Sequence, residues 1–382
     1  MSQRQLRMAL VGCGQIADAH LQEVRKLNGV EVVGVCDRHL ELAEQVSARF
    51  GRPTVFADLD TMLRTARPDV VHVTTPPQTH RPIAIAALRA GAHVYVEKPF
   101  AVNLAEADEI LGTAKSVGRL VCVGHDHLFD PAWERCRALY QSGRLGRVVH
   151  VDSVQGYDLD GPFGRVAMAD PEHWIHQLPG GVFHNTISHA VYKITEFLPD
   201  ERPDIWATWF SADGQTERPT DLRVMLKGRE VTANLICSAF ARPTQRLARV
   251  YGTRQCVEVD LDGRLLRRSR SAIMPGSFAK IEAPFRHLTE AAVAVGRSVR
   301  HFLRCDLHFF TGMRRLFESF YHAAAEGGEP PIPYAEIRRV TVLMDRIFES
   351  CRGEAQSPIR PADGRADAAS RRDWSAPIVE RV

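Results

Sequence analysis

The sequence predicts an α/β fold in two parts, a doubly wound parallel sheet followed by a strand-rich α+β domain. Three observations predict it. In the first hundred residues, short apolar runs alternate with segments of helical spacing. Between residues 147 and 263, strand-like runs are accompanied by turns such as Lys227-Gly228 and Asp262-Gly263. Two later segments, Phe302–Ala325 and Tyr334–Ser350, carry apolar residues three and four apart and predict long helices.

The composition is typical of a globular protein with two domains. The chain has 382 residues, of which 45% are hydrophobic and 25% charged, enough apolar material for a large core. The net charge of +3 gives no electrostatic case for nucleic-acid or membrane binding. The eight cysteines contain no CxxC pair and are predicted to be reduced core residues. With no secretory segment and no long apolar run in the sequence, we expect a cytoplasmic protein.

A glycine-rich turn joins the first predicted strand to the first predicted helix. The apolar run Arg7–Val11 ends in the sequence GCGQIA at residues 12–17, and helical spacing follows over Asp18–Leu27. The β-branched run Val30–Cys36 then ends at Asp37. Strand, glycine turn, helix, strand and acidic end are the order of a Rossmann dinucleotide-binding unit.

The residue types of this turn suit a bound pyrophosphate. Gly12 permits the tight turn, and Gly14 has no side chain that would hold the phosphates away from the backbone. Ala17 is small enough for close packing of helix against strand, and the helix N-terminus supplies N–H donors. We therefore predict that Gly12, Gly14, Gln15 and Ile16 contact the cofactor.

The acidic residue after the second strand bears on the choice of cofactor. Asp37 lies about twenty residues beyond the turn, the spacing expected for a carboxylate that accepts hydrogen bonds from the ribose hydroxyls of NAD. Its charge would repel the 2′-phosphate of NADP, so NAD is predicted. Arg38 is the next residue and can stack on adenine or pair with that phosphate, which leaves the use of NADP open.

The alternation of strand and helix continues to residue 99. Predicted helices cover Leu40–Phe50, Asp58–Thr65 and Arg81–Ala90, and predicted strands cover Thr54–Phe56, Val70–Thr74 and His93–Val96. Ligands of such sheets bind at the carboxyl ends of the strands. Cys13, Asp37, Thr75 and Lys98 all follow strands and should converge on one crevice, and the predicted cofactor contacts there include Thr75, Pro76, His80, Glu97 and Lys98.

Several motifs resemble those of the Gfo/Idh/MocA family, the relatives of glucose–fructose oxidoreductase and inositol 2-dehydrogenase. They are Glu97-Lys98-Pro99 after a strand, the TTPPQTH segment with His80, Val123–His127 with Phe129 and Pro131, Ser142–Gly146, Gly180-Gly181 followed by His189, and Tyr251-Gly252-Thr253. The resemblance runs from about Leu6 to about Cys351. It implies a Rossmann domain over residues 1–124 and an α+β domain over 125–352 with a large, mostly antiparallel sheet. Residues 353–382 are expected to form a tail, and the family implies a homodimer or homotetramer.

Lys98 is the first predicted catalytic residue. A lysine at the end of a buried strand lies beside the nicotinamide in such folds, where loss of solvation lowers its pKa. It can then serve as a proton donor or acceptor at the oxygen of a secondary alcohol or ketone. Glu97 is expected to hold the Lys98 ammonium or a cofactor hydroxyl. The resemblance also implies a cis bond between Lys98 and Pro99.

His189 is the second predicted catalytic residue. The resemblance assigns an acid–base histidine to position 189 and a carboxylate to position 185, one helical turn earlier. Here position 185 is Asn185, which can orient a substrate hydroxyl but cannot take a proton. The expected set of lysine, aspartate and histidine is therefore reduced to Lys98 and His189.

Other candidates for substrate contact are Trp174, His176, Asp126 and Tyr157, in segments that line the substrate pocket of family members. Each of them has an equally good interpretation as an ordinary core or surface residue. No metal site is predicted, because His125 and His127 should point to opposite faces of a strand end and no third ligand has a recognisable spacing.

The predicted function is that of an NAD-dependent oxidoreductase acting on a sugar, cyclitol or related polar small molecule. Two alternatives stay open. One is a redox-neutral enzyme with tightly held NAD, in which oxidation assists an elimination or hydrolysis. The other is a non-catalytic, NAD-binding regulatory protein, an interpretation that Asn185 favours and Lys98 and His189 oppose.

Overall fold

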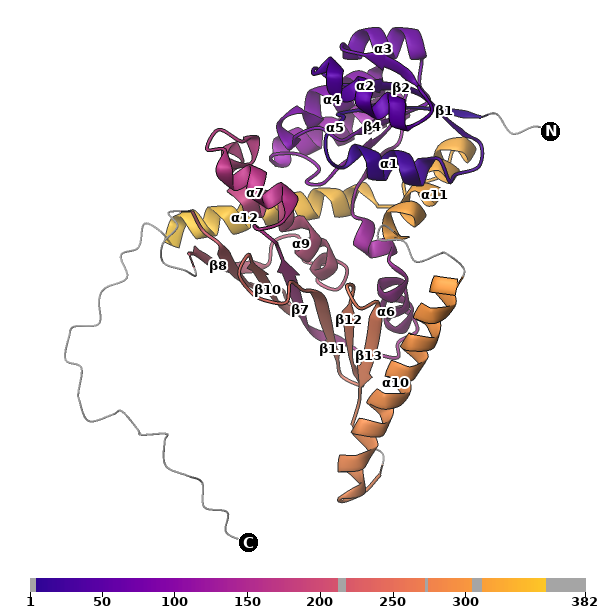
Figure 1. The fold of residues 1–382 in the computed structure, drawn as a ribbon. Helices are drawn as coiled ribbons and strands as arrows, with labels where there is room; N and C mark the ends of the chain where they lie inside the picture. Colours follow the sequence, from indigo (N-terminus) through magenta and orange to yellow (C-terminus); the bar gives the residue numbers. More distant parts are fainter. Residues whose placement is uncertain (1–4, 212–217, 272–273, 304–310, 355–382) are drawn as a thin grey trace.

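The structure is a computed structural model that describes residues 5–211, 218–271, 274–303 and 311–354 (Figure 1). Two sheets form the two parts of the molecule, and helix α12 (Tyr334–Glu354) lies between them. It contacts a helix of the first part as well as a strand and a helix of the second. No helix in the described ranges is both long and apolar enough to cross a membrane.

The first sheet has six parallel strands in the order β3-β2-β1-β4-β5-β6. Its strands are β1 (Leu6–Val11), β2 (Val30–Cys36), β3 (Thr54–Phe56), β4 (Val70–Val73), β5 (His93–Val96) and β6 (Val121–Val123). The order reverses between β1 and β4, which creates a crevice at the carboxyl ends of these strands. The predicted doubly wound parallel sheet is therefore confirmed.

Five helices connect these strands and cover both faces of the sheet. They are α1 (Ala17–Val24), α2 (Leu40–Arg49), α3 (Leu59–Ala66), α4 (His80–Arg89) and α5 (Leu104–Val117). Local capping fixes two of their beginnings: the side chain of Asp58 accepts from the Thr61 N–H, and that of Asn103 accepts from the Glu106 N–H. Gly118 ends α5 in the left-handed region, at φ +62°.

The second sheet has seven strands in the order β13-β12-β11-β7-β10-β9-β8. They are β7 (Val148–Gly156), β8 (Asp204–Phe210), β9 (Asp221–Lys227), β10 (Thr232–Ser238), β11 (Arg246–Gly252), β12 (Cys256–Asp260) and β13 (Leu265–Ser269). All neighbours are antiparallel except β7 and β10, so the predicted mostly antiparallel sheet is confirmed. Its inner face packs on α6 (Pro131–Gln141), α9 (Ser188–Thr195) and α12.

The later part of the chain differs from the prediction in three elements. Strand β13 was not predicted, and neither was the helix α10 (Phe278–Leu303). The helix predicted over Phe302–Ala325 is wrong in extent, because α10 ends at Leu303 and α11 (Thr311–Glu326) begins after residues 304–310, which lie outside the described ranges. Apolar spacing on both sides of that gap joined two helices into one prediction. The predicted tail falls outside the described residues from 355 onward, and α12 extends through its first two residues.

Helix α11 returns the chain to the first sheet. Its buried side chains Leu316, Phe317 and Phe320 belong to the hydrophobic core that contains β1, β4 and β5. This packing buries apolar surface from both ends of the sequence in one core. The division at residue 124 remains a prediction, and residues near 320 complete the core of the first part.

Candidate functional site

The glycine turn after β1 lies against the end of β4. Gly12 has φ +102°, and a Cβ on it would lie 2.7 Å from the backbone of both Thr74 and Thr75. Gly14 is exposed, and a Cβ there would meet no atom within 4 Å. Ala17 is fully buried behind the turn. The inner side of the turn is therefore tightly packed and its outer side is open, as a bound pyrophosphate requires.

Asp37 is fixed at the end of β2 beside this turn. Its Oδ2 accepts a hydrogen bond of 2.7 Å from the Cys13 N–H, and its Oδ1 accepts one of 2.8 Å from the His39 N–H. Arg38 is exposed and donates through Nε to Nε2 of His39 at 3.1 Å. A carboxylate held in this place can accept hydrogen bonds from the hydroxyls of an adenosine ribose.

His80 ties the ends of β4 and β5 together. Its ring is fully buried, with Nε2 at 2.9 Å from the Thr75 carbonyl and Nδ1 at 3.0 Å from the Pro99 carbonyl. The pKa of His80 is below its usual value, because burial lowers it by more than the hydrogen bonds to backbone carbonyls raise it. Both ring nitrogens contact the protein backbone. His80 therefore fixes the positions of Thr75, Pro76 and Pro99 at the crevice.

Lys98 follows β5 and reaches the second part of the molecule. The predicted cis bond between Lys98 and Pro99 is confirmed. The Lys98 Nζ lies 3.2 Å from the backbone carbonyl of Asn185 and 3.4 Å from its Oδ1, on helix α8 (Gly181–Thr186). The pKa of Lys98 is below its usual value, because burial lowers it by more than the carboxyl groups of Glu97 and Asp126 raise it. The ammonium is thus less favoured than that of a free lysine, and two oxygen acceptors of Asn185 hold it.

Lys98 lines a pocket of about 200 Å³ between the two parts of the molecule. Four other predicted site residues line it as well, namely Ile16, Glu97, Asp126 and His189. The remaining walls include His127, Arg246, Arg264 and Met313, none of which was predicted. The pocket therefore joins the glycine turn and the end of β5 to residues of β11 and α11.

His189, on α9, lines the same pocket as Lys98. Its Nδ1 is 2.8 Å from the hydroxyl of Tyr192, and its ring stacks on that of His127 with centroids 4.5 Å apart. Burial holds the pKa of His189 well below its usual value, and the neighbouring His127 and Lys98 lower it further. The imidazole is therefore neutral near pH 7 and able to accept a proton.

The expectation about His127 was wrong in its geometry. Residues 126–129 form a 3-10 helix rather than a strand end, and ligand atoms of Asp126, His127 and His189 all lie within 4.8 Å of one another. Burial raises the pKa of Asp126 to about 7. Burial and the charges of Lys193, Arg246 and Lys98 lower the pKa of His127, and these cations would oppose a bound metal ion. The absence of a metal stays a prediction.

A buried hydrogen-bonded chain runs from Glu97 into the first core. The Oε1 of Glu97 is 2.9 Å from Nε2 of His20, and the Nδ1 atoms of His20 and His72 are 2.9 Å apart. Nε2 of His72 is 3.1 Å from the hydroxyl of Tyr321 on α11. Both histidines are fully buried. None of these partners of Glu97 was predicted.

One arrangement of protons satisfies every link of this chain with neutral imidazoles. Tyr321 O–H donates to His72, Nδ1–H of His72 donates to His20, and Nε2–H of His20 donates to the Glu97 carboxylate. Burial raises the pKa of Glu97, but its hydrogen bond from His20 and the charge of Lys98 outweigh this and hold the pKa below its usual value. Burial also keeps the pKa of His72 well below its usual value. The chain thus holds an ionised Glu97 next to Lys98.

Three predicted substrate contacts lie away from this pocket. Trp174 and His176 belong to a short 3-10 helix, Trp174–Gln177, in a small separate apolar cluster. His176 is held at 2.7 Å from the carbonyl of Ala167. Tyr157 follows β7, and its buried hydroxyl has no hydrogen-bond partner among the described residues. Their predicted roles stay predictions.

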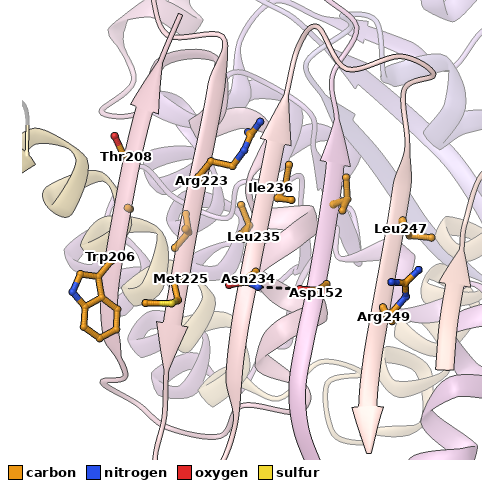
Figure 2. Close-up of a pocket in the computed structure, with 13 residues that line it drawn as sticks. Asp152, Trp206, Thr208, Arg223, Met225, Asn234, Leu235, Ile236, Leu247 and Arg249 are labelled. Carbon is orange, nitrogen blue, oxygen red and sulfur yellow. Dashed lines mark hydrogen bonds between the residues drawn. The ribbon is translucent and has the colours of Figure 1, made fainter. Parts of the chain in front are cut away.

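A larger hollow of about 480 Å³ lies on the outer face of the second sheet and includes none of the predicted site residues (Figure 2). Trp206, Met225, Arg223 and Arg249 line it, and Asn234 donates to Asp152 at 3.1 Å in its centre. These side chains project from β8, β9, β10, β7 and β11, away from the helices of the inner face. The hollow is therefore separate from the site around Lys98.

Comparison with known proteins gives matches to two family models. Residues 6–125 match the model described as oxidoreductase family, NAD-binding Rossmann fold. Residues 133–258 match the GFO/IDH/MocA C-terminal domain.

Among curated proteins, a D-glucoside 3-dehydrogenase of Escherichia coli (strain K12) is 34% identical over 149 residues, covering 39% of this chain and 42% of the relative. A 4-carboxy-2-hydroxymuconate-6-semialdehyde dehydrogenase of Sphingobium sp. is 31% identical over 196 residues, covering 50% and 58%. An inositol 2-dehydrogenase of Saccharopolyspora erythraea is 33% identical over 149 residues, covering 38% and 44%. The matched part of the chain spans about half the length of these relatives.

Solved structures share the fold over nearly the whole chain. The WlbA dehydrogenase from Bordetella pertussis in complex with NADH and UDP-GlcNAcA has a TM-score of 0.76 at 19% identity, covering 93% of this chain and 97% of that one. An oxidoreductase from Agrobacterium radiobacter in complex with NAD+, L-tartaric acid and magnesium has a TM-score of 0.73 at 16% identity, covering 92% and 97%.

Proposed function

Because the chain belongs to the Gfo/Idh/MocA family of NAD-binding oxidoreductases, we propose that it is an NAD-dependent dehydrogenase of a sugar, cyclitol or related polar small molecule. It would transfer a hydride between nicotinamide and a secondary alcohol or ketone. The observation that supports this most is Lys98, which faces a pocket shared by the glycine turn and His189. The names of the relatives, which include sugar and inositol dehydrogenases, agree with this substrate class.

In this proposal the chain's own residues hold the cofactor and move the proton. The turn at Gly12–Ile16 and the Asp37 carboxylate would bind the pyrophosphate and a ribose of NAD. NAD supplies the hydride acceptor or donor. Lys98 takes the hydroxyl proton when the substrate is oxidised and returns it when a ketone is reduced. The carbonyl and Oδ1 of Asn185 aim its Nζ into the pocket.

His189 is the second group that can carry this proton. Its imidazole is neutral near pH 7, because burial holds its pKa well below the usual value. In this form it offers an acceptor for the proton, and its low pKa makes it a weaker base than a free imidazole. Asp126 and Arg246 add polar groups to the same pocket and suit a substrate with several hydroxyls. A hydroxyl donates to the carboxylate and accepts from the guanidinium.

A panel of sugars, inositols and keto-sugars, assayed at the NADH absorbance band with NAD and with NADP, tests this function. We expect turnover with at least one member and a preference for NAD. If NAD stays bound through extensive dialysis and turnover gives no net NADH, the redox-neutral alternative holds instead. If NAD binds and no member of the panel is turned over, that result favours the regulatory alternative. Asn185, which replaces the expected carboxylate, agrees with this alternative.

We further propose that the protein acts as a homodimer or homotetramer in the cytoplasm. Trp206, Phe210 and Met225 on the outer face of the second sheet are 46%, 42% and 47% exposed, an apolar surface that a second copy would cover. The seven cysteines among the described residues form no disulfide, which fits a reducing compartment.

A further inference from the structure

Helix α10 carries a regular apolar stripe on its exposed side. We call this stripe the α10 seam, and it consists of Phe278, Ile281, Phe285, Leu288, Ala292, Val295, Val299 and Phe302. Successive members are three and four residues apart in strict alternation, which is the heptad pattern of helices that pack along a common seam. Its seven large members are each between 50% and 71% exposed. The helix therefore exposes the side chains that a surface helix normally buries.

The opposite side of α10 faces the sheet through polar contacts. Arg268 on β13 donates to Glu290 through its backbone N–H at 3.0 Å and through its Nε at 3.2 Å. Glu282, which flanks the seam, forms an ion pair at 3.4 Å with Arg286 toward this side. These contacts are directional and hold the helix in one orientation along β13 (Figure 1). They leave the seam turned away from the other elements in the described ranges.

A second copy of the same helix is the partner that fits this seam. A heptad stripe packs best against another stripe of the same period. In the described part of the chain, α9, α11 and α12 bury their apolar sides in the two cores, and α10 is the helix that exposes such a stripe. We propose that α10 is a dimerisation helix, in which the seams of two copies pack antiparallel about a two-fold axis.

An antiparallel register exists that uses the whole seam. It pairs Phe278 with Phe302, Ile281 with Val299, Phe285 with Val295, and Leu288 with Ala292 of the second copy. Positions that flank a seam decide whether charges repel across it. Here they are Glu282, Pro284, Thr289, Ala291, Gly296 and Ser298, with a single charge among them. Charge repulsion therefore does not oppose the pairing of two identical seams.

The exposed area is sufficient for a stable dimer. A helix of 26 residues is about 39 Å long. From the exposed fractions of its side chains, the seam offers about 1,000 Å² of apolar surface per copy, where a standard interface buries about 800 Å² per partner.

The α10 seam is distinct from the outer face of the second sheet. Helix α10 lies along β13 at one edge of that sheet, and Trp206 is on β8 at the other edge (Figure 1). Two separate surfaces allow two successive steps of association, and the seam accounts for one of them. This inference does not depend on the proposed activity, because no residue of the nucleotide turn or of the Lys98 pocket is part of the seam.

Charged substitutions in the seam test this proposal by molecular mass. We expect Leu288→Glu and Val295→Glu to halve the mass of the assembly in sedimentation velocity and light scattering. The dissociation constant of this step should rise by about a hundredfold or more, because a carboxylate would be buried in an apolar contact. Val293→Glu is the matched control. Val293 is 52% exposed on the same helix but lies off the seam, so this variant should keep the mass of the wild type.

Three results would overturn the proposal. They are a monomeric wild type, seam variants that keep the full mass, and a Val293→Glu variant that dissociates as readily as the seam variants. Flotation of a monomeric wild type with phosphatidylcholine–phosphatidylserine vesicles would assign the seam to lipid.

NAD affinity and thermal melting report whether each variant is folded. If a glutamate variant aggregates, the double variant Leu288→Cys, Ala292→Cys replaces it. Oxidation should then give a covalent dimer that the wild type does not form.

Discussion

The two sheets position functional groups in different ways. In the first sheet, all strands run in parallel, so the residues after β1, β2, β4 and β5 lie together at the carboxyl end of the sheet. The topology alone therefore gathers Gly12, Asp37, Thr75 and Lys98 there. In the second sheet, neighbouring strands are mostly antiparallel, and their ends alternate between two edges. Pocket residues from this half come from a 3-10 helix, α9 and β11, each brought in by tertiary packing.

This difference teaches where each half tolerates change. The cofactor side depends in part on backbone geometry, such as the contact of Gly12 with Thr74, and a residue at such a position cannot vary without disturbing the fold. The substrate side depends on side chains such as Asp126, His189 and Arg246, which can be exchanged on an unchanged frame. A family with this construction can keep one cofactor and vary its substrates.

The largest expected effect is that of Lys98→Ala, which separates chemistry from cofactor binding. We expect kcat to fall by about a hundredfold to ten-thousandfold, as for other acid–base groups, while the dissociation constant of NAD stays within about threefold. Stopped-flow kinetics and fluorescence titration measure the two quantities. Lys115→Ala is the control, since Lys115 is exposed on α5 and does not line the pocket. A Lys98→Ala enzyme with nearly wild-type kcat would remove Lys98 from the mechanism.

The next effect contrasts two glycines of one turn. Gly12→Ala should destabilise the protein by about 2–4 kcal/mol, because the residue has a positive φ and its Cβ would meet the backbone at 2.7 Å. Gly14→Ala should leave the unfolding free energy nearly unchanged, since its Cβ would meet no protein atom within 4 Å.

The same pair separates folding from binding. We expect Gly14→Ala to weaken NAD binding by about tenfold or more, because the methyl group would occupy space needed by the pyrophosphate. Denaturant unfolding and NAD titration give both readings. Equal stability of the two variants would contradict the idea that backbone packing defines the cofactor side.

A smaller effect is expected from Asp37→Ser. Removing the carboxylate removes its repulsion of a 2′-phosphate, and we expect the preference for NAD over NADP to relax by about tenfold. The ratio of kcat/KM for the two cofactors measures it, with Asp60→Ser on the exposed side of α3 as the control. A wild type that prefers NADP would mean that Arg38 decides the choice of cofactor.

The smallest effect is a shift in pH dependence caused by Asn185→Asp. The new carboxylate would lie about where Oδ1 now contacts the Lys98 Nζ at 3.4 Å, so it favours the ammonium and raises the pKa of Lys98. In alcohol oxidation, where the neutral amine takes the proton, the acid limb should move to higher pH by about one unit. In ketone reduction, where the ammonium donates, activity should extend to higher pH.

The pH range of that shift narrows the choice of group. Burial lowers the pKa of Lys98 from 10.5, whereas it holds the pKa of His189 well below 6.5. A limb that moves above pH 6.5 therefore excludes His189 and leaves Lys98 or Asp126, whose pKa burial raises to about 7. A profile that does not move at all would show that none of these groups titrates in the catalytic step.

The sequence was informative where function depends on local backbone geometry. The turn at Gly12, the carboxylate at Asp37 and the lysine after β5 were all predicted, because each follows a strand at a fixed distance. His127 and Arg246 were missed, since a histidine in a 3-10 helix and an arginine that begins a strand carry no local sign of a pocket. Tyr321 was missed for a related reason, because it contacts a histidine 249 residues earlier.

Helix α10 shows a different limit of prediction. Apolar residues at three and four spacing reveal which side of a helix avoids water, and they do not reveal what covers that side. In α11 the apolar side is covered by the first sheet, and in α10 it remains exposed. Only the arrangement of the whole chain distinguishes these two cases.

The hydrogen-bonded chain that ends at Tyr321 also leads to an expectation about the order of folding during synthesis. When the ribosome has released residues 1–124, β1, β4 and β5 can pair, but His72 still lacks the hydroxyl that α11 brings. A buried imidazole without its partner is unfavourable, and Phe317 and Phe320 are still missing from the same core. We therefore expect the nascent first part to remain loosely packed, with Glu97 poorly held. Catalytic competence would arrive late, when the last helices emerge, so a prematurely terminated chain would have little opportunity to oxidise substrate.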